Sequence, residues 1–267
     1  MRTRIISDLH LGHSATRLTD PSMLEPVLEG VDHLVLAGDV WQECKLGPER
    51  AEALRQYKKL LEMVRGRGIT VEVLRGNHDP GSGSGVSWLR DRSILVTHGD
   101  AVYDDATPWS RGFPKYRKEV DDIIARYAPT AHRAEACAER AREIALALKF
   151  EPLPKLPPPL NFFATALWPP RRAFEMLRVW RDMGNEGIRF LRRTGNGAKV
   201  LVCGHFHQAG IWQRDGYLVL NTGSFMHGSR TWMVDLSSDD RLTARSIVLE
   251  NDQFVPAEVK GRWLLDG

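Results

Sequence analysis

Ile5-Ile6-Ser7-Asp8-Leu9-His10 is the stretch that decides the fold, because an apolar, strand-like run stops abruptly at a carboxylate and an imidazole. The same pattern recurs four more times along the chain. These further runs cover residues 34–39, 71–79, 94–98 and 200–207. In open α/β sheets, ligands bind at the carboxyl ends of the strands. If the five runs are neighbouring strands, their ends form one pocket that holds more than one metal ion.

Two carboxylates supply the oxygen donors of this pocket. Asp8 and His10 lie on one face of an extended segment, because side chains at i and i+2 point the same way. Asp39 follows Gly38, which lets the backbone turn tightly after the strand. A carboxylate at that turn can offer one oxygen to each of two cations. The sequence therefore predicts that Asp39 bridges two ions.

Imidazoles and an amide complete the donor set. His205 and His207 share one face, His98 ends its own run, and Asn77 offers a neutral amide oxygen. Because the set contains no cysteine, Mn, Fe or Zn is favoured over Cu(I). Taken singly, each motif is explained as well by a surface turn, since Asn and Asp favour such geometry. The joint occurrence of five runs favours a metal site.

Composition limits the class of protein. The 267 residues are 42% hydrophobic and 27% charged, which is ordinary for a globular chain long enough for one large α/β domain with an insertion. Cys44, Cys137 and Cys203 form no CxxC pair, which argues against a disulfide framework and for a reducing compartment. No apolar stretch reaches about 18 residues, and the first strand leaves no room for a signal peptide. We expect a cytoplasmic protein.

The middle of the chain differs from the rest in charge and pattern. Residues 106–196 carry 17 Lys and Arg against 10 Asp and Glu, or +7, whereas the remainder carries 20 against 24, or −4. This segment has helical spacing interrupted by prolines. We predict a core formed by residues 1–105 and 197–267, with residues 106–196 inserted as a basic, helical cap or lid.

Periodicity and turn signals predict the individual elements. Strands are expected at residues 4–7, 33–37, 70–74, 93–97 and 199–203, with antiparallel hairpins joining 210–213 to 217–221 and 231–235 to 242–249. Helices are expected at residues 48–65, 115–127, 129–149 and 171–193. A stiff, extended connector is expected at residues 152–159.

The five motifs resemble those of the calcineurin-like metallophosphoesterases, in the same order, over about two thirds of the chain. They are Asp8-x-His10, Gly38-Asp39, Gly76-Asn77-His78-Asp79, Thr97-His98-Gly99-Asp100 and Gly204-His205-x-His207. The resemblance implies a four-layer α/β/β/α sandwich with a dinuclear metal centre. It also implies two ligand sets that share Asp39: one ion held by Asp8, His10, Asp39 and His207, the other by Asp39, Asn77, His98 and His205.

The resemblance further assigns His78 to the substrate phosphate, steadied by Asp79. Two cations ~3.5–4 Å apart would acidify a bridging water and stabilise an in-line displacement of a phosphoester. His78 would then donate a proton to the leaving oxygen or stabilise its charge. Metal binding should weaken at acid pH, because the ligands must lose their protons.

The substrate is less sharply indicated. Gln42 stands where many relatives carry an acidic residue, which puts the subfamily in doubt. The His98 motif with its basic, helical insertion resembles the UDP-2,3-diacylglucosamine diphosphatases, whose third motif carries Arg where this chain has His78. We expect a phosphomonoester, phosphodiester or pyrophosphate substrate, with a nucleotide-sugar lipid as one candidate. The alternatives are a phosphoprotein phosphatase, a nucleotide phosphodiesterase and a non-catalytic scaffold.

The insertion offers candidate substrate contacts. Arg111, Lys115 and Arg117 follow the His98 motif and are predicted to reach a substrate phosphate, although each alone is more simply a surface charge. Residues 171–193 and the apolar run 160–168 either pack a cap onto the core or form a lid that meets lipid or the inner face of a membrane. Nucleic-acid binding is not expected, because the net charge is only +3 and the aromatics do not suggest a stacking platform.

Overall fold

The computed structural model describes residues 1–148 and 170–265. A first sheet has the order β11-β10-β9-β1-β2-β3. Its strands are β1 (Thr3–Ile6), β2 (His33–Ala37), β3 (Thr70–Leu74), β9 (Thr231–Leu236), β10 (Arg241–Glu250) and β11 (Gln253–Leu264). The strands β1, β2 and β3 run parallel, so their carboxyl ends lie at the same edge of the sheet.

A second sheet has the order β4-β5-β6-β8-β7. Its strands are β4 (Val86–Leu89), β5 (Ile94–Thr97), β6 (Val200–Cys203), β7 (Gly210–Arg214) and β8 (Tyr217–Asn221). The strands β5, β6 and β8 are parallel. The five predicted strands that end in ligands are therefore divided between two sheets, three in the first and two in the second.

Alternation along the strands builds the layers. Ile5 and Val35 pack with Val96 and Val202 in a core between the two sheets. Their neighbours in sequence face outward, and Ile6 belongs to a second core on the far side of the first sheet. The central strands β5 and β6 are buried on both faces, because the second sheet is covered on both sides.

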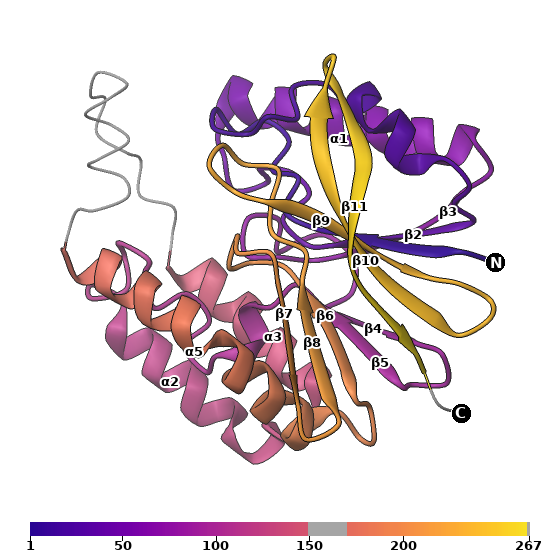
Figure 1. Cartoon of the computed structure of the whole chain (residues 1–267). Helices are drawn as coiled ribbons and strands as arrows, with labels where there is room; N and C mark the ends of the chain where they lie inside the picture. The colour runs from indigo at the N-terminus through magenta and orange to yellow at the C-terminus, as the bar shows by residue number, and fades with distance from the viewer. Residues whose placement is uncertain (149–169, 266–267) are drawn as a thin grey trace.

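Helices cover the two outer faces (Figure 1). The first sheet is covered by α1 (Gly47–Gly66) and the short helix η1 (Pro21–Leu28), whose buried residues share one core with the outward-facing residues of β1 and β2. The second sheet is covered by α2 (Arg117–Tyr127), α3 (Ala134–Ala147) and α5 (Pro170–Thr194). Single turns η2 (Asp100–Val102) and η3 (Ala128–Thr130) complete this side. The predicted α/β/β/α sandwich is confirmed.

The insertion supplies the second outer layer. The helices α2, α3 and α5 bury Val120, Ile144 and Val179 in one core with Leu201 and Val219 of the second sheet. The boundaries 106 and 196, and a further role as a lid, stay predictions. The predicted connector at residues 152–159 and the apolar run 160–168 lie outside the described residues.

Most predicted elements match within a few residues. All five ligand-bearing strands and both hairpins are present, as are helices close to the four expected ranges. In the part of the chain that the structure describes, the strands β4 and β11 and the short helices η1 and η2 were not predicted. Among the described residues, no helix is both long and apolar enough to cross a membrane.

Two glycines bring α5 close to the second sheet. A Cβ atom placed on Gly184 would lie 2.2 Å from the Trp212 ring of β7, and one on Gly187 would lie 2.9 Å from Val219 of β8. These distances are shorter than van der Waals contact. The two positions therefore set how closely the helix packs.

We predict that Gly184→Ala destabilises the protein. The added methyl group overpacks the helix–sheet contact, which costs about 1–3 kcal/mol and outweighs the roughly 1 kcal/mol that Ala gains in helix propensity. The matched control is Gly66→Ala in α1, where a Cβ meets nothing within 4 Å. That variant should gain about 0.4–1 kcal/mol. Urea unfolding measures both; equal effects would contradict the close packing of α5.

Candidate metal centre

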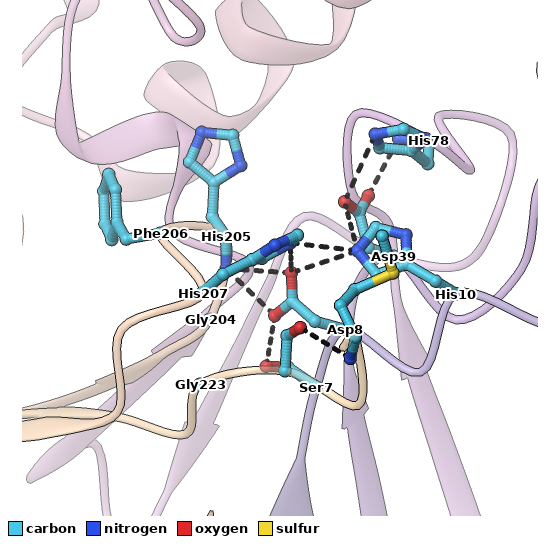
Figure 2. A network of polar contacts seen from close by, with 12 residues as sticks. Ser7, Asp8, His10, Asp39, His78, Gly204, His205, Phe206, His207 and Gly223 are labelled. Atoms are coloured by element: carbon cyan, nitrogen blue, oxygen red, sulfur yellow. Dashed lines mark hydrogen bonds and ion pairs between the residues drawn. The ribbon is translucent and has the colours of Figure 1, made fainter. Parts of the chain in front are cut away.

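Asp8, Asp39, His78 and His205, from the loops after β1, β2, β3 and β6, lie together (Figure 2), and His98 after β5 contacts His205. The loops after β1, β2 and β3 come from the first sheet, and those after β5 and β6 come from the second. They carry all seven predicted ligands. Each predicted ligand set draws on both sheets.

The first predicted ligand set is compact. Asp8, His10, Asp39 and His207 each offer one ligand atom, and these atoms all lie within 4.8 Å of one another. The Nε2 atoms of His10 and His207 are 3.0 Å apart. Nε2 of His207 is 3.2 Å from Oδ1 of Asp8, and Nε2 of His10 is 3.7 Å from Oδ2 of Asp39. This spacing of carboxylates and imidazoles fits a divalent metal ion.

The second predicted set surrounds His98. Its Nε2 lies 3.4 Å from Oδ2 of Asp39 and 3.2 Å from Oδ1 of Asn77. Nδ1 of His205 is 3.2 Å from the same nitrogen. Oδ2 of Asp39 thus faces both His10 and His98, whereas Oδ1 accepts a hydrogen bond from the backbone N–H of His78. One oxygen therefore faces both sets, in place of the expected one oxygen for each ion, and bridging by Asp39 stays a prediction. The mixed nitrogen and oxygen donors fit a borderline metal.

The backbone at these positions is unusual. Asp8, His10, Asp39, His205 and His207 all have positive φ angles, between 50° and 70°. Residues other than glycine rarely adopt this left-handed conformation, and such strain concentrates at functional sites. Five of the seven predicted ligands share it.

Motif glycines make room for the ligands. A Cβ atom on Gly204 would lie 1.9 Å from Oδ2 of Asp8, and one on Gly76 would lie 2.3 Å from Oδ1 of Asp39. Side chains at these two positions would displace the carboxylates. Gly76 of the third motif and Gly204 of the fifth are therefore required, because the carboxylates lie too close to their backbone to leave room for a side chain.

Buried carboxylates and histidines shift each other's pKa values. Burial acts to raise the pKa of Asp39, but the charge and hydrogen bond of His98 outweigh it and hold the pKa well below its usual range. Burial acts to lower the pKa of His98, but Asp39 raises it well above its ordinary value. Burial lowers the pKa of His78 to about 4. At neutral pH, Asp39 is therefore ionised and the His78 ring is neutral.

The side chains of the site differ in exposure. The side chain of His98 is fully buried, whereas those of His78 and His207 are 19% and 30% exposed. On another side, the ring of Trp109 packs 5.0 Å from that of His205. A substrate would therefore approach past His78 and His207.

Asp79 contacts the backbone of Asp39 and is fully buried. Its Oδ1 accepts hydrogen bonds from the backbone N–H groups of Gly76 and Asp39, at 2.8 and 3.0 Å, and its Oδ2 accepts one from Val40 at 2.8 Å. Burial and the charge of Asp39 raise the pKa of Asp79 to about 7. These contacts tie the third motif to the second. That Asp79 also steadies His78 stays a prediction.

The three predicted substrate-binding residues lie at the start of α2 or just before it. Arg111 is half-buried, two residues beyond Trp109. The Lys115 ammonium lies 5.1 Å from the centre of the Tyr116 ring. Arg117 is exposed and donates to Asp121 at 2.9 Å. Their role in binding phosphate stays a prediction.

Three residues around the ligands were not predicted from the sequence. Trp109 and His13 pack against the rings of His205 and His10, respectively. Gln42, noted only as a departure from relatives, is fully buried and contacts both His10 and His78. For Gln42 the sequence offered one signal, a polar residue three positions after Asp39. For Trp109 and His13 it offered none, because ring packing depends on tertiary structure.

Comparison with known proteins identifies the family. The family model for calcineurin-like phosphoesterases matches residues 1–209. No curated protein sequence matches the chain. Solved structures, by contrast, align with nearly the whole chain at low sequence identity.

Vacuolar Protein Sorting 29 from Cryptosporidium parvum is 13% identical, with a TM-score of 0.44, covering 99% of this chain and 98% of its own. The E. coli phosphoesterase Yfce is 18% identical, with a TM-score of 0.42, and both chains are fully covered. The cold-active protein-tyrosine phosphatase of a Shewanella species is 14% identical, with a TM-score of 0.41, covering 96% of this chain and 80% of its own.

We predict that Asp39→Asn weakens metal binding at both predicted sites. The bridging oxygen loses its charge, so the affinity should fall by more than the ~10–100-fold typical of losing a supporting contact to a ligand. Calorimetric titration of metal-stripped protein with Mn²⁺ measures this. The exposed Asp32→Asn should bind like the wild type. Loss of one binding event with the other unchanged would contradict a bridge.

A second prediction concerns the hydrogen bonds that Asp79 accepts from the backbone of Gly76, Asp39 and Val40. Asp79→Ala leaves three buried N–H donors without an acceptor. Because each costs about 1–3 kcal/mol, we expect the free energy of unfolding to fall by roughly 3 kcal/mol or more. Asp79→Asn keeps one oxygen acceptor and should lose less. Urea unfolding distinguishes the two; equal stability of the alanine variant and the wild type would refute this role.

Proposed function

The chain belongs to the calcineurin-like phosphoesterases, and we propose that it is a metal-dependent phosphoesterase with a dinuclear centre. The proposed reaction is hydrolysis of a phosphomonoester, phosphodiester or pyrophosphate bond. The observation that carries the proposal is the position of Asp39 Oδ2, which faces His10 of one ligand set and His98 of the other.

The ligand side chains have the properties that such a centre needs. Asp8 and Asp39 are ionised carboxylates, and the histidines offer ring nitrogens toward them. When bound, two divalent cations would acidify a water molecule and neutralise charge on the phosphoryl oxygens. Mn is the proposed metal, with Fe or Zn as alternatives.

His78 is proposed to act on the substrate. Its ring is partly exposed, and its Nε2 lies 4.0 Å from Oδ2 of Asp39, which places it beside both ligand sets. A neutral imidazole there can donate a hydrogen bond to the leaving oxygen and stabilise the charge that develops on it. Asp79 contributes indirectly by fixing the backbone that carries Asp39 and Gly76.

We further propose a phosphorylated small molecule or lipid as the substrate. The C-terminal half of α5 packs on the core, where Ile188, Phe190 and Leu191 are buried. Its N-terminal half leaves Phe174 67% exposed and Leu177 63% exposed. These exposed apolar side chains favour a substrate with acyl chains, or contact with a membrane surface. Faster hydrolysis of a nucleotide-sugar lipid than of a simple diester or a phosphoprotein would support this.

His78→Ala tests the proposed mechanism. With Mn²⁺ supplied, the wild type should hydrolyse a generic phosphodiester, whereas the variant should keep its metal and lose about 10²–10⁴-fold in kcat. Metal analysis and steady-state assays measure the two properties. The exposed His132→Ala serves as the control and should retain full activity.

Two other outcomes are informative. Full activity in His78→Ala would remove this residue from the mechanism. Wild-type protein that holds no transition metal and turns over no phosphoester would instead favour a scaffold of the same fold.

A further inference from the structure

Gln42 joins a predicted metal ligand to the predicted catalytic histidine. It lies three residues beyond Asp39 and is fully buried. Its Nε2 is 2.9 Å from Nδ1 of His10, and its Oε1 is 3.0 Å from Nδ1 of His78. One side-chain amide therefore bridges the two rings.

The amide couples the protons of these rings. A glutamine side chain donates from one end and accepts at the other, and a neutral imidazole carries its proton on only one nitrogen. If Nδ1 of His10 donates to Gln42, then Nδ1 of His78 must accept from Gln42, and the reverse also holds. The two histidines therefore carry their protons on opposite nitrogens.

The metal site decides which arrangement applies. Nε2 of His10 faces Asp8 and Asp39, at 3.7 Å from an oxygen of each. If this nitrogen binds an ion through its lone pair, the ring proton is on Nδ1, where ligating histidines donate to a second residue. Gln42 then presents Oε1 to His10 and donates from Nε2 to His78. The proton of His78 consequently lies on Nε2, the nitrogen nearest Asp39.

The two ends of the Gln42 amide exchange places by a half-turn of the amide group, so the protons on the two rings decide which end faces each ring. A carboxylate at this position behaves differently, since it accepts from both rings at once.

We propose that Gln42 is a positioning residue whose amide couples an ion at His10 to the location of the proton on His78. With an ion at His10, Gln42 would donate to Nδ1 of His78, and His78 would present an Nε2–H group toward the phosphoryl oxygens. The proposal rests on the proposed function, because it needs the metal centre that the function requires.

Nitrogen-15 NMR of the histidine rings tests the coupling, with Zn²⁺ as a diamagnetic probe. In zinc-loaded wild-type protein we expect His10 to be protonated on Nδ1 and His78 on Nε2. His78→Ala assigns the second signal by removing it. A zinc-loaded protein in which His78 carries its proton on Nδ1 would overturn the proposal.

Two substitutions separate coupling from simple packing. Gln42→Glu should keep zinc, because a carboxylate still accepts from His10, but His78 should now be protonated on Nδ1. Gln42→Leu fills a similar volume without hydrogen bonds and should weaken zinc binding by about 10–100-fold. Gln56→Leu in α1 is the matched control and should change neither property. If Gln42→Glu leaves the His78 signal as in the wild type, the amide has no such role.

The outcomes also distinguish this inference from the proposed function. Zinc uptake without any phosphoester hydrolysis would contradict the function while the expected ring protonation still supports the coupling. Uptake and hydrolysis with His78 protonated on Nδ1 would overturn the role of Gln42 alone. Failure to bind zinc at all would overturn both.

Discussion

The arrangement of this site depends on fixing the carboxylate of Asp39. Its Oδ1 accepts from the backbone N–H of His78 at 2.8 Å, while Asp79 holds the backbone of Asp39 and Gly76 from below. A buried carboxylate is costly unless hydrogen bonds and opposite charges surround it. The hydrogen bonds between Asp39 and the third motif therefore have two effects. They offset the cost of burying the Asp39 carboxylate, and they orient its Oδ2 toward two histidines.

The sequence predicted those parts of the fold that local pattern determines. Apolar runs that stop at ligands identified β1, β2, β3, β5 and β6, and the end of each run located the site. The division of these strands between two sheets follows from tertiary pairing, which the family resemblance supplied and periodicity did not. The strand β11 was not predicted, because it lies at a sheet edge, contains Pro256, and exposes alternate charged residues.

The site shows the same division between local and tertiary information. The seven predicted ligands could be found from sequence because each belongs to a short motif at a strand end. The role of Gln42 could not be found in this way, since it depends on two rings that come from loops 32 and 36 residues away along the chain. Likewise, the basic insertion was recognised as helical, but its packing on the second sheet depends on Gly184 and Gly187, whose spacing has no distinctive pattern.

Each predicted ligand set takes residues from both sheets, and this has a thermodynamic consequence. An ion held by the predicted ligands Asp8 and His207, or by Asp39 and His205, would link the two sheets, and the unfolded chain offers no comparable arrangement. Occupancy is then linked to global stability by mass action, at about 2.7 kcal/mol for an ion present at 100 times its dissociation constant. The free concentration of transition metal would thereby raise the free energy of unfolding, apart from any effect on turnover.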